Sequence, residues 1–347
     1  MSIITAVGID LAKNVFQICA LNQAERVVFN KKVSRSNLLK EIVKLPKCKI
    51  FMEACGSSHF WAEQCRKLGH EVGMIAGQHV KKFVVGDKSD KIDAHAIVIC
   101  GLRPSTRLVP IKNPTQLREQ AKHRIRTRLV RDRTALLNEM RSFLYEHGIV
   151  FPKTKAVFLR ELLLLIHSDK IDPGLKMMMA DLHCEYLELN ERIEKYEAQI
   201  KTSFSDCSLR KKIEKIHGVG PLTATAILSE HGSHNTFKNG RHFAAFLGLV
   251  PRHSGSGGKN SNFGISKRGD AYIRTLLIHG ARSALRHTHK REDRLALWCE
   301  GLKQRVGANK AAVALANKNA RIIWKLLNSE DSYEPDKEPI KEVKKAA

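Results

Sequence analysis

Four acidic residues in the first hundred positions have types and spacing suited to phosphodiester chemistry. Asp10 closes one short apolar run, Glu53 closes another, and Asp90 and Asp93 stand three residues apart where a further apolar segment begins. Carboxylates that converge from separate elements can hold two Mg²⁺ ions about 4 Å apart across a scissile phosphate. Carboxylate oxygens also suit Mg²⁺ better than zinc. We therefore treat these four side chains as candidate ligands of two magnesium ions.

Each acid taken alone has a simpler explanation. Asp10 could cap a turn, and Asp90 and Asp93 could complement the dipole at the start of a helix. As a set, however, the acids occupy a first strand, a later strand and a following helix. That order is the one expected for a ribonuclease-H-like sheet.

Strands and helices alternate in the segment that must position these acids. Apolar runs separated by turn residues predict a hairpin over Thr5 to Leu21 and a third strand over Arg26 to Val33. Helical segments then alternate with short strands over Lys49 to Met52 and Glu71 to Ile75. The pattern predicts an α/β sheet with acids at the carboxyl ends of its strands, where such sheets bind ligands.

The segment from Thr115 to Glu146 is strongly helical and strongly basic. A solvated helix face usually mixes charges of both signs, so the basic excess favours a surface that follows nucleic-acid phosphates. A second long helix, Leu175 to Phe204, has apolar spacing close to that of a coiled coil and is expected to run antiparallel to the first. The candidate phosphate ligands on the first helix are Arg124, Arg126, Arg128 and Arg131.

A helix, a glycine turn and a second helix are predicted over Lys212 to Glu230. Gly218 and Gly220 permit a tight turn whose amides, with the next helix N-terminus, could hold a DNA phosphate without reading bases. This pattern is typical of a helix-hairpin-helix, and an ordinary helical hairpin is the alternative. Lys267 and Arg268, which precede a helix starting at Ala271, are further candidates for phosphate contact.

The stretch from Pro251 to Lys259, PRHSGSGGK, combines small residues with basic flanks. It predicts an open backbone with Arg252 and Lys259 available to an anion. Its spacing does not match a Walker phosphate loop, and a flexible linker would explain the composition as well.

The composition favours a nucleic-acid partner. The 347 residues include 60 Lys and Arg against 35 Asp and Glu, a net charge of +25. Phosphates neutralised by these side chains release counterions, which strengthens binding. No apolar run of membrane-spanning length and no signal peptide is found, so we expect a cytoplasmic, nucleoid-associated protein with no membrane partner. The eight cysteines show no zinc-binding spacing.

Several sequence blocks together resemble the IS110 family of bacterial insertion-sequence transposases, in its IS1111 branch. The blocks, in family order, are GIDLAKNVF, MEACGSSHFWA, KSDKIDAHAI, GVGPLTATAILSE, LGLVPR, SGSGGK and SKRGDAYIRTLLIHGAR. The resemblance covers about residues 3 to 327. It implies a RuvC-like domain, a C-terminal transposase domain, and recombination guided by a bridge RNA from the element's non-coding end. It also implies a homo-oligomer, either dimer or tetramer, whose active site combines acids and serine from different subunits.

The resemblance assigns the metal-binding acids to Asp10, Glu53, Asp90 and Asp93, and the nucleophile to Ser256. The family shows two adjacent serines before the glycine, whereas Gly255 separates the two here, so Ser254 remains an alternative. The expected domains are 1–108 (RuvC-like), 109–207 (basic, coiled-coil) and 208–328 (transposase), followed by a disordered tail at 329–347. A water-using junction resolvase and a non-catalytic nucleic-acid scaffold are the competing functions.

Overall fold

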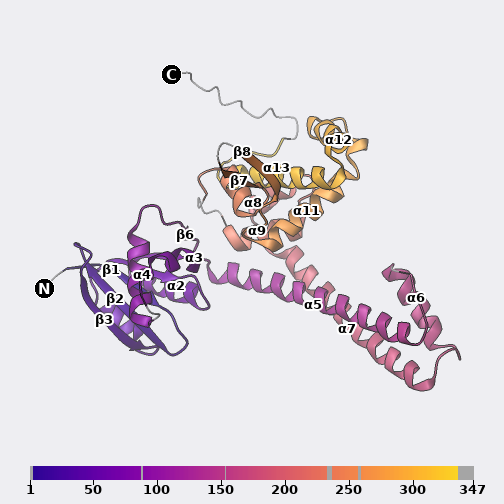
Figure 1. Cartoon of the computed structure of the whole chain (residues 1–347), viewed down its shortest axis with the longest axis horizontal. Coiled ribbons are helices and arrows are strands. Elements are labelled where there is room, and N and C mark those ends of the chain that lie inside the picture. The colour runs from indigo at the N-terminus through magenta and orange to yellow at the C-terminus, as the bar shows by residue number, and fades with distance from the viewer. Residues whose placement is uncertain (1–2, 87–88, 153, 233–236, 257–258, 335–347) are drawn as a thin grey trace. The chain divides into compact units, whose positions relative to one another are not determined.

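The chain forms two compact units, which are described separately (Figure 1). The computed structural model describes residues 3–86, 89–152, 154–232, 237–256 and 259–334, without side chains at 253–262. The first unit comprises residues 1–115 and 233–238, and the second comprises 116–232 and 239–347. Most of the predicted disordered tail lies outside the described residues. Within the described chain, no helix combines the length and apolar character needed to cross a membrane.

The first unit is built on a six-stranded mixed sheet. Its strand order is β3-β2-β1-β4-β5-β6. β1, β2 and β3 form an antiparallel meander, β4 and β5 run parallel to β1, and β6 is antiparallel to β5. The predicted α/β class is therefore confirmed. The strands are β1 (Ile4–Asp10), β2 (Val15–Asn22), β3 (Val27–Ser34), β4 (Lys49–Glu53), β5 (Glu71–Ile75) and β6 (Leu108–Val109).

Helices cover both faces of this sheet because its central strands are apolar on both sides. Val7 and Ile9 of β1 pack with the core beneath α1 (Leu38–Val43) and α2 (Ser58–Lys67). Ala6, which precedes Val7 and faces the other side of the sheet, packs with the core beneath α3 (Gly77–Val80) and α4 (Asp90–Leu102). A short 3-10 helix, η1 (Lys81–Phe83), joins α3 to the chain before α4.

A glycine in β1 lets α4 approach the sheet closely. A Cβ at Gly8 would collide with the carbonyl oxygen of Ala94, the fifth residue of α4. Because side chains alternate along a strand, Asp10 shares the α4-covered face with Gly8. The contact between β1 and α4 at Gly8 therefore lies two residues before Asp10, on the same face of the sheet.

The second unit begins with long antiparallel helices. α5 (Pro114–Glu146) starts at the edge of the first unit and pairs with α7 (Pro173–Thr202). The antiparallel direction follows from two contacts, Arg126 to Glu197 and Arg133 to Asn190. Apolar residues from α5, α7 and α6 (Lys155–Ile166) form a shared core. α6 was not predicted from the sequence.

The rest of the second unit is mostly helical, as predicted. Its helices are α8 (Ser208–Glu214), α9 (Pro221–His231), α10 (Gly240–Phe246), α11 (Ala271–Leu285), η2 (Thr288–Lys290), α12 (Arg294–Val306) and α13 (Ala308–Leu327). α13 packs against α10, α11 and α12. One antiparallel hairpin, β7 (Pro251–Ser256) with β8 (Lys259–Ile265), interrupts the helices.

Candidate active site and nucleic-acid interface

The sheet register places Asp10 and Glu53 side by side. β1 and β4 are parallel neighbours, with Ile9 aligned to Met52, so the next residues along both strands are these two acids. Neighbouring strands lie about 4.8 Å apart. Phe51, which alternates in phase with Glu53, packs in the core beneath α4, so both acids share the α4-covered face. Both are half-buried at the carboxyl ends of their strands.

The other two acids lie in the first turn of α4. Ser89 caps this helix by accepting a hydrogen bond from the Ile92 amide at 3.4 Å. Asp93 is half-buried and precedes Ala94, the residue whose carbonyl faces β1. Asp90 is exposed and lies 3.4 Å from the Lys32 ammonium of β3. Asp93 therefore lies one residue before the point where α4 meets β1, while Asp90 takes a lysine partner.

Two more residues, Gly77 and Cys55, define the surroundings of the strand-end acids. The Glu53 Oε1 atom lies 2.5 Å from where a Cβ would stand at Gly77, the first residue of α3. Burial raises the pKa of the Cys55 thiol, and the negative charges of Glu53 and Asp10 raise it further. This exposed cysteine was not identified from the sequence, although it is two residues from a candidate ligand.

The donor chemistry of this corner fits a hard divalent cation, but its side chains are not closed around one. In the part of the chain that the structure describes, no group of three or more His, Cys, Asp or Glu side chains is positioned to hold a metal. Carboxylate oxygens are nevertheless the ligands that Mg²⁺ prefers. The backbone therefore gathers the right donors at one corner, and side-chain rotation must complete any coordination shell.

The predicted open segment around the candidate nucleophile is a β-hairpin rather than a linker. Ser256 ends β7 opposite Lys259, and Ser254 pairs with Ser261. The side chains of these residues, and the whole of Gly257 and Gly258, are not among the described parts of the chain. At the base of the hairpin, the exposed Arg252 guanidinium lies 5.0 Å from the ring centroid of Phe263.

The chain segment after β8 presents two more cations. Lys267 and Arg268 are both exposed. The Lys267 amide donates to the Gly248 carbonyl at 3.2 Å, which fixes the backbone there. Their position between the hairpin and α11 is compatible with phosphate contact.

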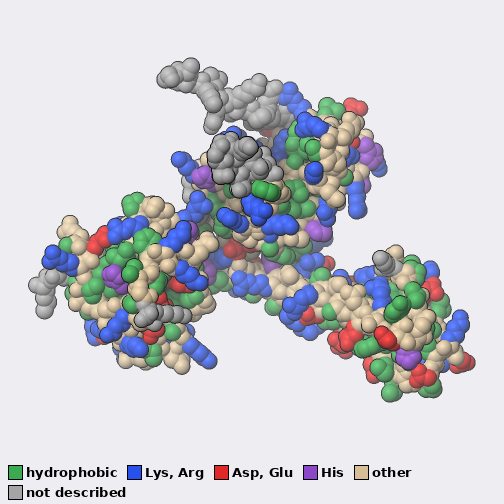
Figure 2. Space-filling model, viewed as in Figure 1, with side chains coloured by type: hydrophobic (Ala, Val, Ile, Leu, Met, Phe, Trp, Pro, Cys, Tyr) green, Lys and Arg blue, Asp and Glu red, His purple; other side chains and the backbone are tan. Residues whose placement is uncertain are grey.

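The four candidate arginines of α5 do not share one environment. Arg124, Arg128 and Arg131 are exposed at intervals of four and three residues and therefore lie along one helix face. Arg126 points elsewhere, because its side chain is 19% exposed and binds Glu197 of α7 at 2.5 Å. It thus holds two helices together. Figure 2 shows that Lys and Arg side chains are widespread on the visible faces of both units.

The glycine turn between α8 and α9 is needed for packing. Gly218 has a φ of +85°, and a Cβ there would come within 2.6 Å of the Gly280 carbonyl oxygen in α11. Gly220 is different, because the space around it is open and it directly precedes Pro221 at the start of α9. Only the second glycine leaves room for an approaching ligand.

A buried polar network joins α5, α9 and α11 and was missed in the sequence. His123 is almost fully buried, with Nδ1 2.9 Å from the Tyr272 hydroxyl and Nε2 3.1 Å from Thr225 Oγ1. Burial, reinforced by the nearby Arg126, lowers the pKa of His123 to about 4. His123 stands in a segment rich in arginine, so the sequence gives little indication that it is buried. Its apolar neighbours on the same helix are the only such signal.

The protonation of this network follows from the threonine. Thr225 donates its hydroxyl proton to the Pro221 carbonyl at 2.7 Å, so its oxygen accepts from His123 Nε2. Nδ1 of the neutral ring is then an acceptor. The Tyr272 hydroxyl therefore donates to it, and every polar atom of the imidazole is satisfied.

A basic protein with paired strand-end acids and a helical, phosphate-compatible second unit has the features of a nucleic-acid-processing enzyme. Residues 7–149 match a family model described as a transposase and named for the DEDD transposases of IS110. Residues 210–296 match the transposase IS116/IS110/IS902 family. The chain belongs to this family of insertion-sequence transposases, which confirms the predicted family and the predicted DNA strand cleavage and transfer.

Full-length relatives support the same conclusion. A probable family 20 transposase of Pseudomonas aeruginosa is 42% identical, with 96% of this chain and 99% of the relative covered. The transposase for insertion sequence element IS1111A of Coxiella burnetii is 39% identical over 96% of this chain and 92% of its own. The transposase for insertion sequence element IS1328 of Yersinia enterocolitica is 37% identical, with coverage of 92% and 96%. DNA is therefore the substrate.

Proposed function

We propose that the first unit is a ribonuclease-H-like, RuvC-like catalytic domain whose acids bind two Mg²⁺ ions. The observation that supports this most strongly is the parallel register of β1 and β4, which sets Asp10 beside Glu53 on the face covered by α4. A three-stranded meander followed by parallel strands suits that fold. Asp93, in the first turn of the helix that covers this face, and Asp90, if it exchanges Lys32 for metal, would complete the set.

The residues that would hold the ions are Asp10, Glu53, Asp90 and Asp93. Bound there, Mg²⁺ supplies Lewis-acid polarisation of the phosphate and stabilises charge that develops on its oxygens. The protein's own contribution is to fix the carboxylates on a rigid strand pair and helix. The excess of Lys and Arg compensates for the negative charge of a polyanionic substrate.

We propose that Ser256 is the nucleophile, with Ser254 as the alternative. Attack by the serine hydroxyl forms a serine O–P bond and breaks one P–O bond of the DNA backbone, and the departing strand end leaves as a hydroxyl. A hydroxyl of a second strand then attacks the phosphoserine and releases the serine. The number of phosphodiester bonds is unchanged, so rejoining needs no ATP. The end of β7 at Ser256, next to the hairpin turn, supports this role.

The acids and the serine hairpin belong to different compact units. This division suits a composite site in a dimer or tetramer, with acids from one subunit and serine from another. We further propose that a bridge RNA selects the DNA target by base pairing, as in other RNA-guided systems. The helix-hairpin-helix, through Gly220 and the start of α9, would hold backbone phosphate without reading sequence.

A covalent-adduct assay tests this proposal. Full-length protein with Mg²⁺, co-purified RNA and labelled donor DNA should give a denaturant-stable protein–DNA adduct. Ser256→Ala should abolish the adduct and leave DNA binding intact, whereas Ser254→Ala should retain the adduct. Adducts that persist in Ser256→Ala but vanish in Ser254→Ala would transfer the role. Cleavage with water incorporated and no adduct in wild type would instead identify a junction-resolvase mechanism.

A further inference from the structure

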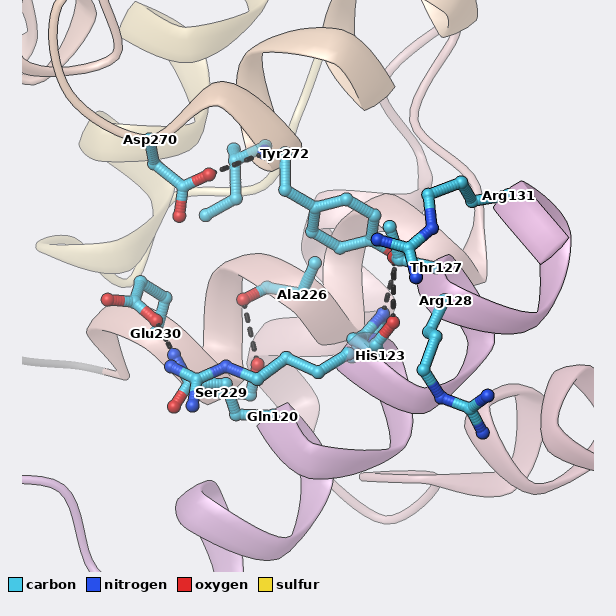
Figure 3. Close-up of a pocket in the computed structure, with 12 residues that line it drawn as sticks. Gln120, His123, Thr127, Arg128, Arg131, Ala226, Ser229, Glu230, Asp270 and Tyr272 are labelled. Carbon is cyan, nitrogen blue, oxygen red and sulfur yellow. Dashed lines mark hydrogen bonds between the residues drawn. The ribbon is translucent and has the colours of Figure 1, made fainter. Parts of the chain in front are cut away.

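The second unit contains a pocket outside the proposed catalytic groups. It has a volume of about 430 Å³ and lies between α5, α9 and the start of α11 (Figure 3). That volume is within the range of roughly 300–1,000 Å³ found for small-ligand sites. All its lining residues belong to one compact unit and have described side chains. Neither the proposed acids nor the serine hairpin contributes to it.

Two arginines and two carboxylates line opposite sides of this pocket. In Figure 3, Arg128 and Arg131 lie on one side, and Asp270 and Glu230 lie on the other. The two arginines share one carboxylate, Asp132, at 2.9 and 3.1 Å, so their charge is only partly compensated.

Arg124 adds a third cation to the lining. It makes no ion pair within the described part of the chain. A site for phosphate alone would gain nothing from two carboxylates. The lining therefore suits a ligand that carries an anion at one end and hydrogen-bond donors at the other.

The space between these two sides is apolar and rigid. Tyr272, Ala226 and Ile273 supply an aromatic ring and aliphatic surface. The ring is held by its hydroxyl, which donates to His123 at 2.9 Å, and His123 is held in turn by Thr225. Aromatic side chains with fixed orientation are suitable platforms for an unstacked base. The site is thus preorganised rather than assembled by the ligand.

We propose that this pocket binds one unstacked nucleotide of a nucleic-acid strand. Its phosphate lies on the arginines, its base lies against Tyr272, and base N–H groups donate to Asp270 or Glu230. Carboxylates accept hydrogen bonds from exocyclic amines of bases, which gives the pocket a preference among bases. A base within a duplex cannot enter, so the pocket selects a single-stranded or extruded position. This proposal does not depend on Ser256 or on bound metal.

Mononucleotide binding to the full chain, freed of nucleic acid at high salt, tests the pocket. Calorimetry or ligand-detected NMR would compare AMP, CMP, dAMP, ribose 5-phosphate and inorganic phosphate. We expect a nucleoside monophosphate to bind at least about tenfold more tightly than inorganic phosphate or ribose 5-phosphate. Comparison of AMP with dAMP distinguishes an RNA nucleotide from a DNA nucleotide as the occupant.

Two conservative variants separate base recognition from phosphate binding. Asp270→Asn retains a helix-capping side chain, and Glu230→Gln can still bond Gln120. Combined, they should weaken nucleotide binding by about tenfold and leave inorganic phosphate unchanged. Arg131→Gln should weaken both ligands, whereas the matched charge change Arg160→Gln on α6 should affect neither. Thermal melting of each variant checks that it is folded.

Two outcomes would overturn the proposal. Equal affinity for nucleotide and inorganic phosphate, with no effect of the carboxylate variants, would reduce the pocket to a backbone-phosphate contact. No binding of any mononucleotide at millimolar concentration would remove it as a ligand site. Either result could coexist with a normal Ser256 adduct, so the two proposals fail independently.

Discussion

Acidification should destabilise the second unit through one buried histidine. The folded protein lowers the pKa of His123 from its ordinary value of 6.5 to about 4. Between those values the unfolded chain binds a proton that the folded chain excludes, so the free energy of unfolding falls as pH decreases. Because this pKa falls from 6.5 to about 4, and each pH unit in that interval is worth about 1.4 kcal/mol, we expect a loss of about 3 kcal/mol from pH 7 to pH 4. Above pH 7 the contribution is constant.

Burial of His123 fixes the sign of this effect. Arg126 and Lys122 disfavour the imidazolium, Glu119 favours it, and burial outweighs them all. His123→Gln keeps a hydrogen-bonding side chain but removes the group that titrates. The surrounding charged residues are the same in both proteins, so a difference in pH dependence reports the histidine. Denaturant unfolding at several pH values should show wild type losing about 3 kcal/mol more than the variant. Parallel stability curves, or a ring that titrates near pH 6.5 by NMR, would refute the reasoning.

Three further perturbations follow from the geometry. Asp10→Asn or Glu53→Gln should stop strand exchange at every Mg²⁺ concentration in a recombination assay, and full activity in either variant would remove its proposed metal role. Gly218→Ala should cost at least about 2 kcal/mol, since it combines a left-handed φ of +85° with a backbone collision, and an unchanged melting temperature would contradict this. Arg126→Gln should lower nucleic-acid affinity less than Arg131→Gln in salt titrations, because Arg126 is committed to an interhelical ion pair.

Elements with strong local signals could be predicted from the sequence. The fifth strand, Glu71–Ile75, has the predicted boundaries, and the helix predicted to start at Ala271 begins there, because apolar spacing and turn residues mark these ends. Asp90 and Asp93 were considered for the start of a helix, and both lie in the first turn of α4. Strand ends carrying Asp10 and Glu53 were predictable for the same reason, since an apolar run stops at a charge.

Features that depend on distant partners could not be predicted. The serine hairpin is held by backbone hydrogen bonds between strands whose small side chains carry no alternation signal. α6 contains the run LLLLI, which lacks a one-sided apolar period although Phe158 and Leu162 are buried. The Lys32 partner of Asp90 lies on a strand far away in the sequence. No local pattern specifies such a pairing.

The contact of Gly218 with Gly280 links two regions of the gene. The backbone of each glycine occupies the space that a side chain on the other would need. A substitution at either position alone would therefore push α11 away from the turn. Substitution at either position by random mutagenesis should therefore be recovered only with compensating changes elsewhere. Libraries that diversify the C-terminal half of this enzyme should hold both glycine codons fixed.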